Sequence, residues 1–111
     1  MTPPMHALQK ENDFARLFRR GKKHHFPAFM ISVLSNPHSY NRFAFIVSAS
    51  IEKSAVKRNR MRRRVREWVR KNQFKFCRSS DVAFLFRKDA FRMSRKKIYE
   101  ELEEAVKKIF S

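Results

Sequence analysis

The chain has 111 residues, with 27 Lys and Arg against 10 Asp and Glu, which gives a formal net charge of +17 at neutral pH. This length fits one domain, and a hydrophobic fraction of 42% with twelve Phe argues against a disordered chain. So large a charge attracts polyanions, and the absence of a long apolar run predicts a cytoplasmic protein without a membrane partner. The single cysteine, Cys77, excludes an internal disulfide.

The first nine residues, 1–9, include Pro3 and Pro4 and show no hydrophobic period. Chain ends of this kind are usually poorly ordered. We therefore predict a flexible N-terminal arm over 1–9 and a single domain over 10–111, since the sequence contains no internal repeat and is too short for a second domain.

A short amphipathic helix is predicted next, beginning at Asn12 or Asp13 and running to about Arg20. Its apolar residues have the i, i+3, i+4 spacing of one helix face and are Phe14, Leu17 and Phe18. Gly21 follows the helix and is the only glycine of the chain, so we expect it to form a left-handed C-cap.

Alternating hydrophobicity predicts two strands, over 27–34 and 42–48, and residues 22–26 allow a further short strand. In the first of the two, Phe29 and Ser32 fall on opposite faces. A turn-forming Ser-Asn-Pro-His sequence begins the short link between the two strands, which predicts an antiparallel hairpin.

The most distinctive stretch is KRNRMRRRVREWVRKN, residues 57–72, in which nine of sixteen residues are Lys or Arg and one is acidic. Its apolar residues follow one helix face, with Ser54 as the candidate N-cap; they are Met61, Val65, Trp68 and Val69. A helix exposed only to solvent normally mixes charge signs, because neighbouring like charges repel. This helix is therefore predicted to meet a dense array of anions, above all nucleic acid.

The last part of the chain combines a strand with a helix. Residues 82–86 are apolar throughout, which predicts a central strand. Ser94 caps a final helix whose core stripe is Ile98, Leu102, Ala105, Val106 and Ile109. The order α-β-β-(β)-α-β-α predicts a two-layer α+β domain.

The sequence shows no pattern of a protein active site. None of the four histidines, His6, His24, His25 and His38, pairs with Cys or a carboxylate at metal-ligand spacing, and a phosphate-binding glycine loop is excluded by the single glycine. We therefore predict no catalytic residue and no metal site on the protein.

Aromatic side chains offer a second kind of binding chemistry. Phe14, Phe18 and Phe29 can lie together near Arg16, and rings beside cations hold single-stranded nucleic acid without reading its sequence. From composition alone, burial of these rings in the core is the more common outcome, so both interpretations stay open at this point.

Two segments resemble the bacterial ribonuclease P protein family. The block AVKRNRMRRRVREWVR, residues 55–70, follows a strand and a loop and carries the triplet Arg58-Asn59-Arg60 near the start of a helix. The segment LQKENDFARLFRRG, residues 8–21, is similar to the family's first helix, with its two Phe and a terminal Gly. The resemblance covers about residues 8–110.

The resemblance implies a fold and two RNA-binding surfaces. The fold is a mostly antiparallel four-stranded sheet with three helices and a left-handed βαβ crossover. The basic helix would bind the catalytic RNA through Lys57, Arg58, Asn59, Arg60, Arg62, Arg63, Arg66 and Arg70. A cleft between the first helix and the sheet would hold the single-stranded 5′ leader of precursor tRNA, lined by Phe14, Arg16, Phe18, Phe29 and Ser32.

Two departures from the family's pattern stand out. In Ala49 to Ser54, two lysines and a glycine of the family are missing and one residue is inserted, so we expect an altered loop conformation. Ser32 stands where the family often has an aromatic residue, which predicts weaker stacking on the leader.

By this resemblance the chain is an accessory subunit of ribonuclease P, the endonuclease that removes the 5′ leader from precursor tRNA. Catalysis would belong to the RNA subunit, with Mg²⁺ held mainly by that RNA, and the protein alone would be inactive. The implied partners are the RNase P RNA and precursor tRNA, without an obligatory protein partner.

Three other interpretations share the same composition. A structural, ribosomal-protein-like RNA-binding protein with no role in cleavage is the strongest of them. A basic-helix DNA-binding protein would need a dimerising heptad zipper after the helix, and residues 73–80 contain none. A membrane-surface helix is compatible with Trp68 and the arginines, but the apolar stripe is narrow and is needed for the core.

Overall fold

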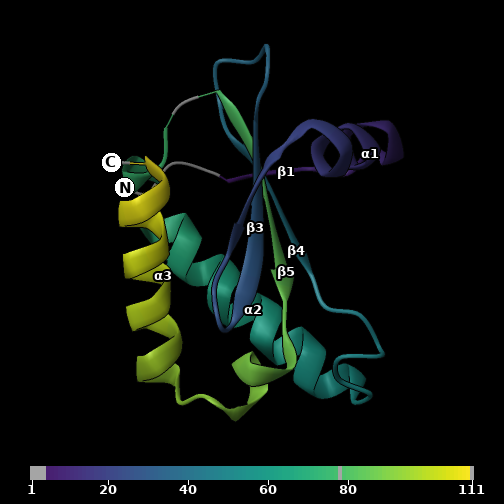
Figure 1. Ribbon diagram of the computed structural model, residues 1–111, viewed down its shortest axis with the longest axis vertical. Coiled ribbons are helices and arrows are strands. Elements are labelled where there is room, and N and C mark those ends of the chain that lie inside the picture. Colours follow the sequence, from purple (N-terminus) through teal and green to yellow (C-terminus); the bar gives the residue numbers. More distant parts are fainter. Residues whose placement is uncertain (1–4, 78, 111) are drawn as a thin grey trace.

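The computed structural model describes residues 5–77 and 79–110 (Figure 1). Within them, three consecutive strands separate the first two helices, and the last strand lies between the second and third helices. In chain order the elements are β1 (His6–Ala7), α1 (Glu11–Arg20), β2 (Lys22–His25), β3 (Phe29–Ser35), β4 (Arg42–Ile46), α2 (Ala55–Lys71), η1 (Gln73–Lys75), β5 (Ser80–Phe86), η2 (Lys88–Arg92) and α3 (Arg95–Phe110).

The strands form one mixed, five-stranded sheet in the order β1-β4-β5-β3-β2. β3 pairs antiparallel with β2 and β5, whereas β4 pairs parallel with β1 and β5. The prediction of a mostly antiparallel four-stranded sheet is therefore wrong, although the α+β class is confirmed. The predicted hairpin is also wrong, because β5 lies between β3 and β4. Val82, Ala83 and Phe84 of β5 point to alternate faces of the sheet, and all three are apolar and buried. A strand that is apolar on both faces is favoured in the centre of a sheet.

The fifth strand comes from the segment that was predicted to be an arm. His6 and Ala7 pair with Arg42 and Phe43, and the Leu8 N–H donates to the Phe43 carbonyl oxygen at 2.8 Å. A two-residue strand is too short to produce a hydrophobic period, so the pattern gave no sign of it. Residues 1–4 lie outside the described residues, and the flexibility of the arm stays a prediction.

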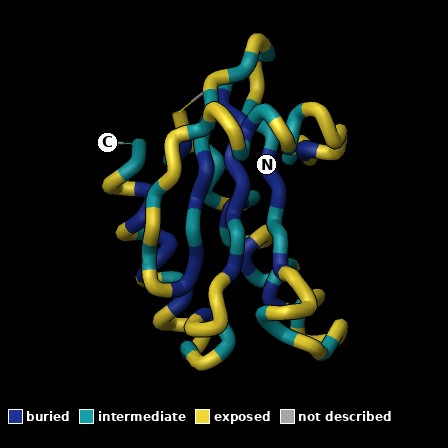
Figure 2. Tube along the Cα trace, turned by 45° about the vertical axis from the view of Figure 1, so that its right-hand side comes forward, coloured by how far each residue is buried: buried dark blue, intermediate teal, exposed yellow. Residues whose placement is uncertain are grey.

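Helices cover both faces of the sheet, where two layers were expected (Figure 1). α2 and α3 pack on the face that carries Phe29, Phe43 and Phe84, and together they enclose the main core. α1 crosses the other face, where Leu17 joins a smaller cluster with Ala44. Figure 2 shows the buried residues concentrated along the strands between these helices.

α2 connects the two neighbouring parallel strands of the sheet. β4 ends before the helix and β5 follows it, and the two strands pair in register from Arg42 with Asp81 to Ile46 with Leu85. The β4–α2–β5 unit is thus a βαβ crossover of the type that the resemblance implied. Its left-handed sense stays a prediction.

A buried ion-pair network fixes α1 to the sheet. The fully buried Asp81 accepts hydrogen bonds from Arg42 Nε at 2.8 Å, from Arg42 Nη2 at 2.7 Å and from Asn36 Nδ2 at 2.8 Å. Arg42 Nη1 also donates to Asp13 Oδ2 on α1 at 3.1 Å. The hydrogen bond to Asp81 is the main reason why the pKa of Arg42 is raised. One guanidinium therefore joins β4, β5 and α1.

Gly21 is required for space and not for a left-handed turn. Its φ of −65° and ψ of 148° are those of an extended residue, so the predicted left-handed C-cap is wrong. A Cβ atom at this position would overlap the Leu17 carbonyl oxygen and lie 2.5 Å from Ser32 Oγ. Ser32 Oγ donates to that same carbonyl at 3.0 Å, so the end of α1 lies directly on β3.

We predict that Arg42→Met lowers the free energy of unfolding by about 3–5 kcal/mol, because it leaves the Asp81 carboxylate buried and unpaired. Urea denaturation measures the change. Arg16→Met is the control, since Arg16 is 40% exposed and pairs with Asp13 at the surface, where an ion pair contributes at most about 1 kcal/mol. Equal losses in the two variants would contradict a special role for Arg42.

Glu101 is a buried acid on α3 and is 8% exposed. One of its oxygens accepts a backbone hydrogen bond from Ala28, whereas Oε2 has no partner among the described residues. Burial raises the pKa of Glu101, and this effect exceeds the opposing effects of Lys97 and of the Ala28 hydrogen bond. The folded protein therefore binds this proton more tightly than the unfolded chain does.

We predict that Glu101→Gln changes how stability depends on pH. In the wild type, the Glu101 contribution is most favourable below the ordinary carboxyl pKa of about 4.3 and is lost as pH rises through the raised value. The variant lacks this loss, so it gains stability relative to the wild type between pH 4 and pH 8. Urea unfolding across that range provides the measurement, and parallel pH profiles for the two proteins would contradict the prediction.

Candidate nucleic-acid interface

α2 turns its arginines outward because its apolar stripe is fixed in the core. Met61, Val65 and Val69 are all buried against the sheet and α3. The Ser54 side chain accepts a hydrogen bond from the Lys57 N–H at 3.3 Å, which confirms the predicted N-cap. Burial of the stripe holds the like charges of the helix together against their mutual repulsion.

One flank of α2 forms the wall of a groove of about 470 Å³, which we call the edge groove. The wall contains Asn59, Arg62, Arg63 and Arg66. The floor is apolar and comes from three other parts of the chain: Met5, Ala7 and Leu8 in and around β1, Phe14 of α1, and Phe43, Ala44, Phe45 and Ile46 of β4. β1 pairs with Arg42 and Phe43, and the groove lies over β4 from Phe43 to Ile46. The groove thus combines aromatic and aliphatic surface with the guanidinium groups of three arginines.

The opposite flank of α2 faces η2. Lys57, Arg60 and Arg64 line a smaller hollow of about 210 Å³ there, together with Glu52 and Phe91. Because positions 57, 60 and 64 lie on one side of a helix and 59, 62, 63 and 66 on the other, α2 presents cations in two directions.

Some of the predicted RNA-subunit contacts are cations without an acidic partner in the described residues, and others are held by contacts within the protein. Among the described residues, no acidic side chain forms an ion pair with Lys57, Arg60, Arg62, Arg63 or Arg66. Arg62 instead donates to Asn59 Oδ1. Uncompensated arginines of this kind suit phosphate, which matches the planar guanidinium fork.

Two of the predicted contacts are already used within the protein. Arg58 Nη1 donates to the carbonyl oxygens of Glu52 and Lys53 at 2.7 and 2.9 Å, so it braces the loop whose sequence departs from the family's pattern. Arg70 pairs with Glu67, which lowers the pKa of that exposed carboxyl. These two arginines are less available to a ligand than Arg60, Arg63 and Arg66, which are exposed.

Part of the predicted cleft is brought together. Phe14 and Phe18 stack on one face of α1 with ring centroids 6.2 Å apart and an interplanar angle of 17°. Both rings pack against the small cluster beneath α1, and Phe14 also lines the edge groove. Arg16 lies on the same helix and is held by Asp13 at 3.0 Å.

Two residues of the predicted cleft are not at a surface. Phe29 is fully buried on the opposite face of the sheet, edge-on to Phe84 and Phe86, so its assignment to the cleft is corrected to the core. Ser32 is fully buried beneath α1 and donates to the Leu17 carbonyl, so it too cannot line an open cleft. The strand's alternation placed them on opposite faces correctly but could not show that α1 covers Ser32.

The floor of the groove contains residues that sequence reasoning missed. Met5, Ala7 and Leu8 belong to the segment predicted as an arm, and Phe45 and Ile46 were expected only as strand residues. A signal for Leu8 was present, because it is the one large aliphatic residue before α1 and it is 4% exposed.

Residues 5–77 and 79–110 contain neither a metal-ligating cluster nor a membrane-spanning helix. This part of the chain holds no group of three or more His, Cys, Asp or Glu side chains placed to bind a metal ion. It also has no helix that is both long and apolar enough to span a bilayer.

Comparison with known proteins gives a consistent result. A family model described as Ribonuclease P matches residues 2–110. The ribonuclease P protein component of Pelotomaculum thermopropionicum is 34% identical over 102 residues, which cover 92% of this chain and 90% of that protein.

Solved structures agree with this assignment. The RNase P protein from Thermotoga maritima superposes with a TM-score of 0.84 at 26% identity, over 95% of this chain and 98% of that one. The Staphylococcus aureus RNase P protein gives a TM-score of 0.85 over 97% of this chain and 100% of that one; at 23% identity it supports the fold alone. Because the family model spans almost every residue and a relative above 30% identity matches along most of its length, the chain belongs to the ribonuclease P protein family.

Proposed function

We propose that this protein is the RNA-binding subunit of a cytoplasmic ribonuclease P, in which it binds the catalytic RNA and the 5′ leader of precursor tRNA. The observation that carries the proposal is the edge groove, where Phe14 of α1 faces Asn59, Arg62, Arg63 and Arg66 of α2. An aromatic ring beside free guanidinium groups is the chemistry that holds single-stranded RNA.

In this proposal the two flanks of α2 bind different RNAs. The groove flank binds the leader, with its bases against Phe14 and the apolar floor and its phosphates on Arg62, Arg63 and Arg66. The outer flank, with Lys57, Arg60 and Arg64, lies against the RNA subunit. One helix therefore contacts both catalyst and substrate, which favours precursor over mature tRNA because the mature product has no leader.

Cleavage of the phosphodiester belongs to the RNA subunit in this proposal, with Mg²⁺ held mainly by that RNA, where the ions supply activation of water and charge stabilisation. The protein's own contribution is positive charge and orientation. Its arginines offset phosphate repulsion between the two RNAs and thereby lower the Mg²⁺ concentration that the complex needs.

The first test is cleavage of a leader-bearing precursor tRNA by a bacterial RNase P RNA at low Mg²⁺. We expect efficient cleavage only when the protein is added, and none by the protein alone. Binding to the RNA without rescue of cleavage would favour a purely structural RNA-binding role. Cleavage by the protein alone would overturn the assignment of catalysis to RNA.

The groove is tested in the same reconstituted complex with Phe14→Ala. Loss of one stacked base, worth about 1–3 kcal/mol, should weaken binding of precursor tRNA about 5- to 150-fold and leave mature tRNA unchanged. Phe74→Ala is the matched control, because Phe74 is 80% exposed and lies outside the groove. An equal loss for precursor and mature tRNA would show that the groove does not hold the leader.

A further prediction concerns salt. If α2 neutralises about six to ten phosphates, affinity for RNA falls about 10³- to 10⁵-fold between 50 and 200 mM salt. Arg63→Ala should reduce the slope of log K against log salt by about one unit, whereas Lys107→Ala, an exposed cation on α3, should not. Filter binding with leader-bearing precursor tRNA gives both slopes, and identical slopes in the two variants would remove Arg63 from the leader-binding groove.

A further inference from the structure

A second pocket lies at the far edge of the sheet from the edge groove. It has a volume of about 530 Å³ and is enclosed between α3 and the turn that joins β2 to β3. The residues that matter for its chemistry are His24, Phe26, Pro27, Lys97, Glu101 and Lys108. Its size falls within the range of small-molecule sites, about 300–1,000 Å³.

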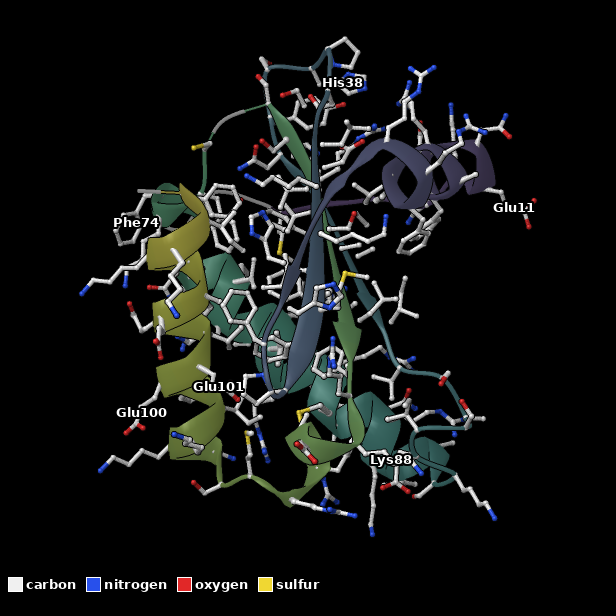
Figure 3. All side chains as sticks on the ribbon, in the orientation of Figure 1. Glu11, His38, Phe74, Lys88, Glu100 and Glu101 are labelled. Atoms are coloured by element: carbon white, nitrogen blue, oxygen red, sulfur yellow. The ribbon has the colours of Figure 1, made fainter. Side chains whose placement is uncertain are left out.

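The pocket contains a buried acceptor without a donor. Glu101 is more than nine-tenths buried, one of its oxygens takes the Ala28 N–H, and Oε2 has no partner among the described residues. Figure 3 shows the Glu101 side chain directed from α3 toward the sheet, whereas Glu100 points away from the protein. An unsatisfied buried carboxylate oxygen is unfavourable, so this position is suited to a ligand that donates a hydrogen bond.

The surroundings of Glu101 restrict the ligand. Lys97 and Lys108 lie on the same side of α3, four residues before and seven after Glu101, and the remaining acid, Glu104, pairs with Lys108 at 3.3 Å. A simple cation would meet these lysines unfavourably. A ligand with a donor group at one end and a negative charge at the other matches the pocket better.

Flat surfaces complete the chemistry. Phe26 and His24 contribute aromatic rings to the pocket lining, and Pro27 adds apolar surface. Unpaired nucleobases stack on such rings and are read through their Watson–Crick edges, while their phosphates attract lysines. A nucleotide of single-stranded RNA has a hydrogen-bond donor for Glu101, a negative charge for the lysines and a flat base for the aromatic rings.

We propose that this pocket holds one unpaired RNA nucleotide whose base carries an amino group, with Glu101 accepting from that group and Lys97 or Lys108 near its phosphate. The inference rests on the proposed function only in taking RNA as the partner, since the site is separate from the edge groove. Cytosine, adenine and guanine supply the amino group. Uracil presents its one Watson–Crick N–H between two carbonyl oxygens, which a carboxylate repels.

The test uses the full-length protein and free mononucleotides, followed by NMR at individual backbone amides. We expect CMP to shift the Ala28 and Lys97 amide signals and to bind about tenfold or more tightly than UMP, because one hydrogen bond to a charged group is worth at least that factor. Equal affinities for CMP and UMP, or shifts confined to residues of the edge groove, would overturn the proposal.

Glu101→Gln separates recognition from folding. Its carbonyl retains the Ala28 hydrogen bond, and its amide presents a donor where the carboxylate presented an acceptor. The variant should remain folded, as its melting temperature reports, and should lose or reverse the preference for CMP over UMP. An unchanged preference in the folded variant would overturn the role of Glu101.

Arg63→Ala is the matched control, because it alters the edge groove and leaves this pocket intact. It should keep the CMP preference while binding of leader-bearing precursor tRNA weakens. If the cleavage test of the proposed function fails but the nucleotide preference persists, the protein binds RNA nucleotides outside a ribonuclease P complex. If cleavage is rescued and the preference is absent, only the second pocket is rejected.

Discussion

The ion pair between Arg42 and Asp81 connects three parts of the chain that are far apart in sequence. It closes the β4–β5 pairing at one end of the strands, and the same guanidinium reaches Asp13 at the start of α1. Phe14 follows Asp13 directly, so the position of this ring over the groove depends on a contact made beneath it. A surface that binds by stacking needs such rigidity, because misplacement of the ring would lose the contact without altering its chemistry.

The cations of α2 are stable for a different reason. Their mutual repulsion opposes the helix, and burial of Met61, Val65 and Val69 offsets it. The protein thus carries an electrostatic strain that a bound polyanion relieves. Binding of RNA should therefore stabilise the fold as well as the complex, by an amount that rises with the logarithm of the ratio of RNA concentration to dissociation constant.

Sequence reasoning succeeded where a pattern was local and failed where partners were distant. The spacing of Met61, Val65 and Val69 fixed the orientation of α2, and alternation assigned Phe29 and Ser32 to opposite faces. Alternation could not reveal that β5 separates β3 from β4, because β5 pairs with residues 39 positions earlier in β4 and 45 to 57 positions earlier in β3. Nor could it place Leu8 and Ala7 in the groove, since a two-residue strand has no period. Periodicity also could not separate core Phe from surface Phe. Phe29 is in the core because α2 and α3 cover its face of the sheet, whereas Phe14 lies on α1 and lines the groove.

The central position of β5 affects how the protein is made. β3 and β4 have both left the ribosome's active site by residue 46, yet each pairs with a strand that ends at residue 86. At bacterial synthesis rates this is a delay of roughly two to eight seconds. During that time two apolar strands lack their shared neighbour and present edges that can pair with other chains. The arginine-rich helix is synthesised within the same interval, and like charges on neighbouring chains oppose their association.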